Sequence, residues 1–286
     1  RVTAIADRRV RGAPPKKARR APFNLNPVGW PPLAFLWKNL IQSGNFASRM
    51  FILRVVLIML LGFIVTHNFH AGGPPLGFIG ALCIFLVLFS VMAGHNLLRV
   101  DLRSDLTMAE QLLSYPLTGS QIFMGETLAP VAILAVFQWL CLLGAVLFLS
   151  FGPHGPSLGA RAVIALAAAI FVPAMDFIMV IIANAVAIMF PTWVRFDRNA
   201  PRGVENLGLG IVVTLGQLLV LFVALLPASL GAFIVGFISA LLLPTRFALC
   251  LAALAGASIL IAEGLWAVSL LGKAFEHFDL SAETTN

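Results

Sequence analysis

The sequence predicts an all-α membrane protein with about six transmembrane helices, an N-terminal interfacial helix and a re-entrant element before the last helix. Three observations support this prediction: 60% of the 286 residues are hydrophobic, 11% are charged, and the mean hydropathy is +0.97. A soluble domain is nearer half apolar and a quarter charged. At about 20 apolar residues per span, the chain holds material for roughly six spans. This composition excludes a soluble globular enzyme, a disordered chain and a secreted disulfide scaffold.

The first thirty residues form a strongly basic tail. Residues 1–20 carry eight Lys and Arg residues against a single acid, Asp7. Such a run is compatible with nucleic-acid binding, but no aromatic-rich nucleic-acid module accompanies it. We therefore interpret it as a cytoplasmic tail that fixes topology and contacts anionic lipid, and we expect no nucleic-acid partner. The first residue is arginine rather than methionine, which is compatible with a piece of a longer protein.

Apolar stretches separated by turn residues predict the membrane elements. The short aromatic segment Pro31–Phe46 has apolar residues at helical spacing and is too short to span, which favours a helix lying on the membrane surface. The expected spans are Met50–Thr66, Leu76–Gly94, Ile122–Phe151, Ala160–Phe190, Leu207–Leu226 and Phe247–Leu271. The chain thus divides into a basic tail (1–30), a transmembrane domain (31–273) and a short cytoplasmic tail (274–286).

The number of spans depends on the segment that follows Pro227. Proline interrupts helices, so we expect the fifth span to end there and Ala228–Leu243 to form a separate apolar run before Pro244. This run has 16 residues and contains Gly231 and Gly236, which favours a re-entrant or helical-hairpin element over a seventh span.

Charge placement predicts the orientation independently. With six spans and the N-terminus inside, sixteen of the nineteen Lys and Arg residues lie on the cytoplasmic side, Arg161 and Arg246 lie outside, and Arg54 lies within the first span. This is the asymmetry of the positive-inside rule. We therefore expect a multi-pass protein of the cell membrane with both termini in the cytoplasm.

The stretch between the second and third spans combines charge with helical periodicity. Leu102, Leu106, Ala109 and Leu113 recur at helical spacing, so one face is apolar and the other is charged. An amphipathic cytoplasmic helix of this kind suits docking onto a soluble partner, and it equally suits a helix that lies on the membrane surface without a partner. The residues that we expect to contact a partner are Arg103, Asp105, Leu106, Glu110 and Leu113.

Three segments resemble a known family. DLRSDLTMAEQLLSYPLTGSQIFMGETLAP (101–130), NAVAIMFPTWVRFDRNAPRGVENLG (184–208) and WKN (37–39) are similar to segments of the ABC exporter family, permeases of the type-2 ABC-transporter class. The resemblance covers most of Leu33–Lys273. It implies six spans, short re-entrant helices before the last span, and a loop after the second span that acts as a coupling helix seated on an ATPase. It also implies a second permease half or a homodimer as a partner.

The ATP-hydrolysing motor is missing from this sequence. No GxxxxGK[ST] motif occurs, because Gly272-Lys273 is followed by Ala274 and lacks the upstream glycine. ATP hydrolysis is therefore expected on a cytosolic ABC ATPase subunit. An intramembrane metalloprotease is also disfavoured, because none of the five histidines has HExxH spacing. The three cysteines show neither CxxC nor Cys/His spacing, and we expect no catalytic residues, metal or cofactor.

Polar residues within the expected spans are the remaining candidates. Asp176 lies near the centre of the fourth span, where it should be protonated, paired or in contact with water. It has two interpretations, a substrate- or ion-path residue and a helix-pairing group. Glu263 and Arg54 could pair, although Arg54 can also snorkel to the surface, and Gln138 and Asn184 could bond between helices. The alternative function is an ion- or proton-coupled secondary transporter that uses Asp176.

Overall fold

The computed structural model describes residues 22–25, 29–43, 74–98, 100–149, 157–191 and 204–277, with residues 53, 56, 57 and 64 as isolated positions. All regular secondary structure in these residues is helical. The shorter elements are α2 (Pro32–Ser43), the π-helix η2 (Ser90–Gly94), α5 (His95–Leu98), α6 (Leu102–Asp105), the 3₁₀-helix η3 (Leu106–Met108) and α7 (Ala109–Leu113). The longer ones are α4 (Pro74–Phe89), α8 (Gly119–Phe148), α9 (Leu158–Met189), α10 (Val204–Leu242) and α11 (Thr245–Glu276).

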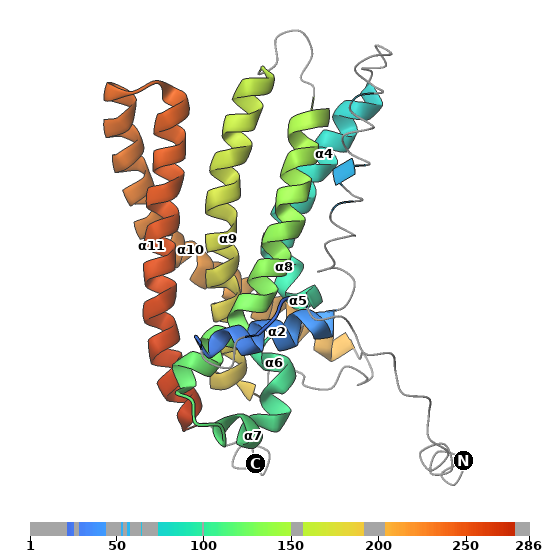
Figure 1. The fold of residues 1–286 in the computed structure, drawn as a ribbon, viewed down its shortest axis with the longest axis vertical. Coiled ribbons are helices and arrows are strands. Elements are labelled where there is room, and N and C mark those ends of the chain that lie inside the picture. Colours follow the sequence, from blue (N-terminus) through green and yellow to red (C-terminus); the bar gives the residue numbers. More distant parts are fainter. Residues whose placement is uncertain are drawn as a thin grey trace, which may run out of the picture.

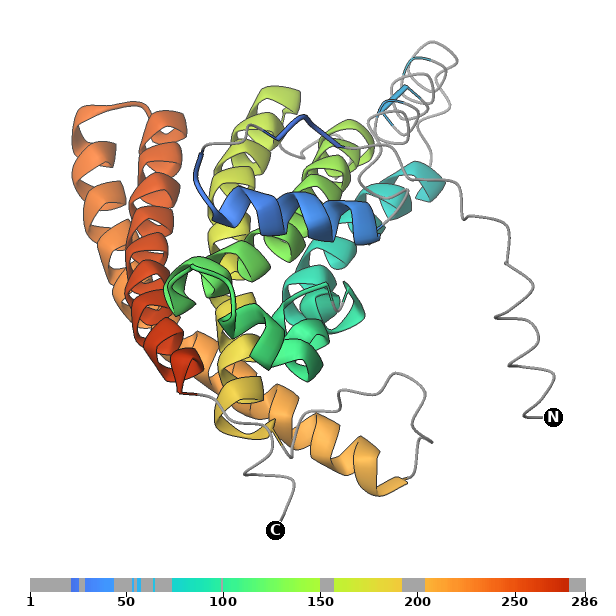
Figure 2. The same cartoon turned by 60° about the horizontal axis from the view of Figure 1, so that its bottom comes forward.

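The long helices stand side by side in alternating directions (Figure 1). Helix α8 packs against α4, α9 and α11, and α11 also packs against α9 and α10. Helix α2 crosses the bundle and packs on α8 (Figure 2). We call the end that carries α2, α6 and α7 the α7 end. The opposite end, where Leu243 and Pro244 join α10 to α11, is the hairpin end.

Five helical stretches among the described residues are long and apolar enough to cross a membrane: Gly77–Asp105, Gly119–Phe148, Leu158–Met189, Gly208–Leu242 and Thr245–Glu276. They correspond to the expected second to sixth spans, so the all-α, multi-pass prediction is confirmed. The expected first span, Met50–Thr66, lies almost wholly outside the described residues, as does Arg54. Helices α8 and α9, at about 45 and 48 Å, exceed the roughly 30 Å hydrocarbon core and must tilt or project beyond it.

Local sequence signals explain where the two central helices begin. Thr118 starts α8 with a capping box, in which its side chain accepts from the Gln121 backbone N–H and the Gln121 side chain accepts from the Thr118 backbone. Ser157 starts α9 by accepting a hydrogen bond from the backbone N–H of Ala160 at 3.2 Å. These caps satisfy backbone donors that the first turn of a helix leaves free.

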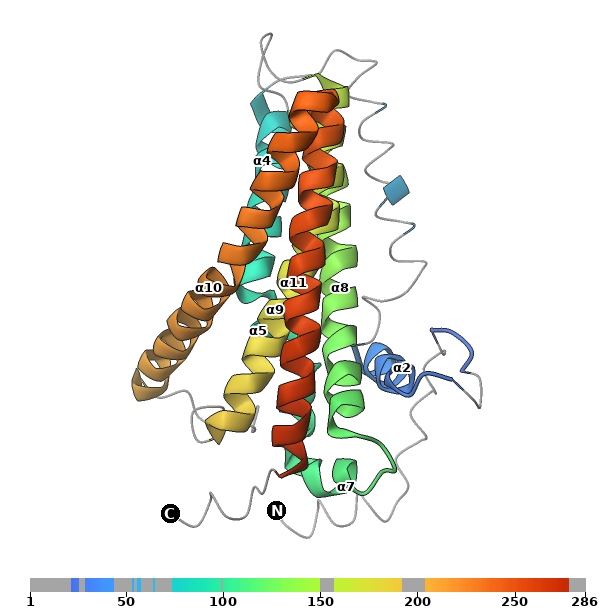
Figure 3. The same ribbon diagram turned by 90° about the vertical axis from the view of Figure 1, so that its left-hand side faces the viewer.

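Helix α10 corrects the expectation of a separate re-entrant element. Pro227 lies inside α10, which continues unbroken to Leu242 over 39 residues, or about 58 Å. An apolar environment offers no water to unwound backbone groups, so retaining the helix around a proline costs less than breaking it. Residues 228–242 are therefore the second half of the fifth span. The N-terminal part of α10 leans away from the other helices (Figure 3).

The two glycines that favoured a hairpin serve helix packing instead. A Cβ on Gly231 would lie 2.2 Å from Ile259 Cδ1, and a Cβ on Gly236 would lie 3.0 Å from Ala252 Cβ. Both contacts are made with α11. Small residues at these positions let α10 and α11 approach closely, as is common between membrane helices.

Candidate functional site

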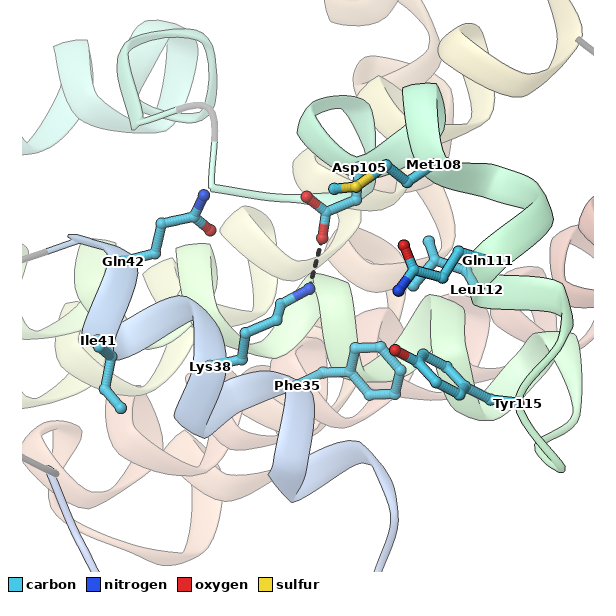
Figure 4. A pocket seen from close by; sticks show the side chains of 9 residues that line it. All are labelled: Phe35, Lys38, Ile41, Gln42, Asp105, Met108, Gln111, Leu112 and Tyr115. Atoms are coloured by element: carbon cyan, nitrogen blue, oxygen red, sulfur yellow. Dashed lines mark hydrogen bonds and ion pairs between the residues drawn. The ribbon is translucent and has the colours of Figure 1, made fainter. Parts of the chain in front are cut away.

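A pocket of about 470 Å³ opens at the α7 end, between α2 and the segment α6–η3–α7 (Figure 4). Helix α2 lines one side and the loop helices line the other. The lining residues are Phe35, Lys38, Ile41 and Gln42 from α2, and Asp105, Met108, Gln111, Leu112 and Tyr115 from the loop. We call this pocket the α2–α7 groove.

Helix α2 is fixed to the bundle by an aromatic side chain and by hydrogen bonds. Phe35 is 7% exposed and packs on Gly125 of α8, where an added Cβ would lie 2.7 Å from Phe35 Cβ. The indole N–H of Trp37 donates to the carbonyl of Phe23 at 2.9 Å. The sequence prediction of a short helix over Pro31–Phe46 is confirmed, and its position follows from these contacts.

A cluster of charged and polar side chains connects α2 to both the loop and α8. Lys38 Nζ donates to Glu126 Oε1 at 2.6 Å and to Asp105 Oδ2. Asn39 Nδ2 donates to Glu126 Oε2 at 2.7 Å. Both carboxylate oxygens of Glu126 are therefore held by consecutive residues of α2. We call Lys38, Asn39, Asp105 and Glu126 the ionic cluster.

The ionic cluster places one ammonium group between two carboxylates. Glu126 has no exposed surface and the Asp105 side chain is 10% exposed, whereas the Lys38 side chain is 41% exposed. Burial alone would lower the pKa of Lys38, but the carboxylates of Glu126 and Asp105 outweigh it and hold that pKa above the usual 10.5. Lys38 therefore stays charged at neutral pH and compensates charges that would otherwise be buried alone.

Arg103 joins the beginning of the loop to the end of the preceding span. Its guanidinium group donates to Asp101 Oδ2 at 2.8 and 2.5 Å, to Asn96 Oδ1 at 2.8 Å and to the His95 carbonyl at 2.6 Å. The His95 ring in turn lies 3.3 Å from Gln217 Oε1 of α10. Arg103 therefore makes intramolecular bonds in this structure.

The five residues expected to contact a partner divide into two groups. Leu106 is fully buried in the core, and Arg103 and Asp105 are bonded inside the molecule. Glu110 is exposed and Leu113 is half-buried. The outward surface of the loop instead consists of Met108, Glu110, Gln111, Ser114 and Tyr115.

The helical periodicity predicted from the sequence gives the wrong buried residue after Ala109. Leu102, Leu106 and Ala109 are buried as expected, but Leu112 replaces Leu113 on the buried side. The prediction assumed one continuous α-helix, whereas the 3₁₀ turn η3 interrupts it. A 3₁₀ turn has three residues per turn and therefore shifts the phase of the residues that follow.

The end of α11 closes the other side of the loop. Glu276 Oε1 accepts a hydrogen bond from the backbone N–H of Gly119 at 2.7 Å, which places a carboxylate at the N-terminus of α8. Gly119 and Gly272 are in such close contact that a Cβ on Gly119 would lie 2.1 Å from the Gly272 carbonyl oxygen. Residues 274–276, expected in the C-terminal tail, therefore belong to α11 and to this contact.

The polar residues predicted within the spans are mostly buried. Asp176, Asn184 and Gln138 have no exposed surface, so Asp176 points into the bundle and not toward lipid. Gln138 bonds between helices as predicted, donating to Ser90 at 2.9 Å. Glu263 is partly exposed, and its pairing with Arg54 falls outside the described residues.

Sequence reasoning missed the ionic cluster, although it singled out WKN and the expected span Ile122–Phe151 contains Glu126. The available signal was Glu126, a single acid near the start of an apolar stretch, together with the Lys38-Asn39 pair in a separate segment.

No group of His, Cys, Asp and Glu residues in the described ranges is arranged to hold a metal ion. Comparisons with models of known families, with curated proteins and with solved structures find no match to this chain.

Proposed function

We propose that this chain is the membrane-spanning permease subunit of an ATP-driven ABC exporter, and that the loop α6–η3–α7 is the docking point of a separate ATPase subunit. The observation that carries the proposal is a short helical loop that is wedged into one end of the bundle and still exposes a polar and aromatic surface. The resemblance of residues 101–130 to ABC exporter permeases agrees with it.

The distribution of described charges supports a cytoplasmic α7 end. Lys38, Arg103 and Lys273 lie toward this end, whereas Arg161 and Arg246 lie at the first turns of α9 and α11, at the hairpin end. The positive-inside rule counts Lys and Arg residues only, and the end with more of them faces the cytoplasm. ATP is hydrolysed there, so a docking surface at the α7 end is on the correct side.

The contacts of the loop explain how force would reach the spans. Leu106 sits in the same buried cluster as Phe123 of α8, Phe177 of α9 and Phe275 of α11. Lys38 connects Asp105 of the loop to Glu126 of α8. Close-packed interiors transmit displacement because they contain little free volume. A movement of the loop would therefore move α2 and the spans with it.

The remaining partners follow from the same proposal. An exporter permease encloses its path between two membrane halves, so we expect a homodimer or a second permease half, surrounded by lipid. The exposed apolar side chains along α10, such as Phe222, Phe233 and Phe237, suit contact with lipid or such a half. A secondary transporter that uses Asp176 is the second candidate, favoured by the complete burial of that carboxyl group.

Co-expression with an ABC ATPase encoded beside its gene tests the proposal. We expect the two polypeptides to co-purify in detergent and the double substitution Met108→Glu and Glu110→Arg to abolish this, because both side chains are exposed on the loop. Arg246→Glu at the hairpin end is the matched control and should leave the complex intact. Docking at the loop would be refuted if wild type, the double variant and Arg246→Glu all recovered the same amount of ATPase.

A further inference from the structure

Three helical elements bring polar side chains together at mid-depth in the bundle, away from the α2–α7 groove. Asp176 lies 18 residues into α9 from the hairpin end, and Gln138 lies 19 residues into α8 from the α7 end, so each is about 27–28 Å along its helix. Ser90 lies at the start of the π-helix η2. Asp176 and Gln138 have no exposed surface, and Ser90 is 5% exposed.

The hydrogen bonds in this group fix the orientation of the Gln138 amide. The Ser90 hydroxyl donates its single proton to the Val87 carbonyl at 2.8 Å, so its oxygen must accept from Gln138 Nε2 at 2.9 Å. The carbonyl oxygen of Gln138 then has no donor in the structure. The chain of hydrogen bonds therefore ends on an acceptor that lacks a proton.

The carboxyl group of Asp176 has the same deficit. The Gln138 amide lies close enough to act as a weak donor toward it, but neither carboxyl oxygen has a hydrogen-bond partner at normal geometry. Two buried side chains beside each other thus present three oxygen atoms without a donor. Buried polar atoms are rarely left unpaired, because each one costs about 1–3 kcal/mol.

The described residues supply no cation to Asp176. The elements packed on α9 carry the following charged or titratable groups: Glu126 and Cys141 on α8, Glu205 on α10, Arg246, Cys250, Glu263, Lys273 and Glu276 on α11, His95 on α5, and Arg103 and Asp105 on α6. Among the described residues the ion pairs are Lys38–Asp105, Lys38–Glu126 and Arg103–Asp101, none of which includes Asp176. An isolated carboxylate at this depth would cost at least about 2.5 kcal/mol.

Pro173, which lies inside α9, adds no further ligand. Proline at this position frees the carbonyl of Ala169, one turn earlier. The Trp139 indole N–H already donates to that oxygen at 3.0 Å. The oxygen is therefore occupied, which leaves a metal cation with few described ligands besides Asp176 and the carbonyl of Gln138. A proton needs only one oxygen to bind it and one to accept its hydrogen bond.

We propose that Asp176 is an intramembrane proton-binding site, with the Gln138 amide as its polar neighbour. Binding forms one O–H bond on the carboxylate and neutralises its charge. The neutral carboxyl group can then accept from the second N–H of the Gln138 amide, whose first N–H donates to Ser90. The site is separate from the docking loop, and proton binding there does not depend on an ATPase.

Infrared difference spectroscopy of the purified protein in lipid nanodiscs tests this site. We expect wild type at neutral pH to show the C=O stretch of a protonated carboxylic acid in an apolar environment, and Asp176→Asn to lose that band. Glu110→Gln, at an exposed loop position, is the matched control and should retain it. Gln138→Leu should keep the band and move it to higher frequency, because the C=O group loses its polar neighbour.

Three outcomes would overturn the proposal. The first is an ionised Asp176 in the wild-type protein at neutral pH. The second is a carboxylate band that moves on addition of sodium or potassium ions, which would assign a metal cation to the site. The third is a protonated band that Gln138→Leu leaves unmoved. If Asp176→Asn fails to assemble, the wild-type pH titration and Gln138→Leu still decide the question.

Discussion

The substitution Lys38→Met removes the ammonium group that the ionic cluster places between two carboxylates. Glu126 is fully buried and would keep only its bond to Asn39, whereas Asp105 is 10% exposed. Breaking a fully buried pair costs about 3–5 kcal/mol, and an exposed pair is worth about 0–1 kcal/mol. The 41% exposure of the Lys38 side chain places this pair between these limits. We expect a loss of about 2 kcal/mol.

Thermal unfolding in detergent measures that loss. The thiols of Cys83 and Cys141 are buried, so a thiol-reactive dye reports when the bundle opens. At about 2–4 °C per kcal/mol, Tm should fall by about 4–8 °C. Lys273→Met is the matched control, because Lys273 is exposed and makes no ion pair among the described residues. It should leave Tm unchanged.

A double-mutant cycle separates the ionic interaction from simple loss of packing. Adding Glu126→Gln to Lys38→Met removes the uncompensated charge, so it should restore most of the lost stability. A Lys38→Met protein as stable as wild type, or a double variant less stable than Lys38→Met, would refute the reasoning.

The raised pKa of Lys38 also predicts a pH dependence. A group whose pKa is higher in the folded protein stabilises it fully below the unfolded value and loses this effect as the pH rises through the folded value. The Lys38 contribution should therefore be lost as the pH rises above 10.5. A Tm difference between wild type and Lys38→Met that persists unchanged well above pH 10.5 would contradict this assignment.

Two further predictions concern packing and topology. Gly272→Ala should destabilise the protein by about 1–3 kcal/mol, because its Cβ would lie 2.4 Å from the Ser120 backbone nitrogen; Gly210→Ala, at an open helix position, should be neutral or slightly stabilising in the same melting assay. In a cysteine-free background, Pro244→Cys should react with an impermeant thiol reagent from outside, and Ser114→Cys should react only after permeabilisation. Labelling of both from the same side would contradict the single continuous span α10.

Hydropathy and length predicted five of the expected spans because crossing a membrane imposes the same requirement on every helix. The interfacial helix α2 and the Thr118 cap were also predictable, since both depend on neighbouring residues. The complete burial of Asp176 agrees with the high cost of exposing a carboxyl group to lipid.

The features that sequence reasoning missed depend on residues far apart in the chain. Lys38 is separated by 67 residues from Asp105 and by 88 from Glu126, so no local pattern joins them. Pro227 was interpreted from its intrinsic helix-breaking tendency, which the apolar surroundings and packing against α11 override. The same limitation applies to the loop, where a single 3₁₀ turn changes which leucine is buried.

The loop between the second and third spans is anchored at both of its ends. Arg103 attaches its beginning to His95 and Asn96, and Glu276 of α11 binds Gly119 just beyond its end. Fixing the backbone of one residue costs about 1–2 kcal/mol of conformational entropy. The loop is already ordered in the folded protein by the contacts at its two ends. A partner that binds the exposed face of α7 would therefore lose little further entropy in ordering it, so a modest contact area could give useful affinity and fast release.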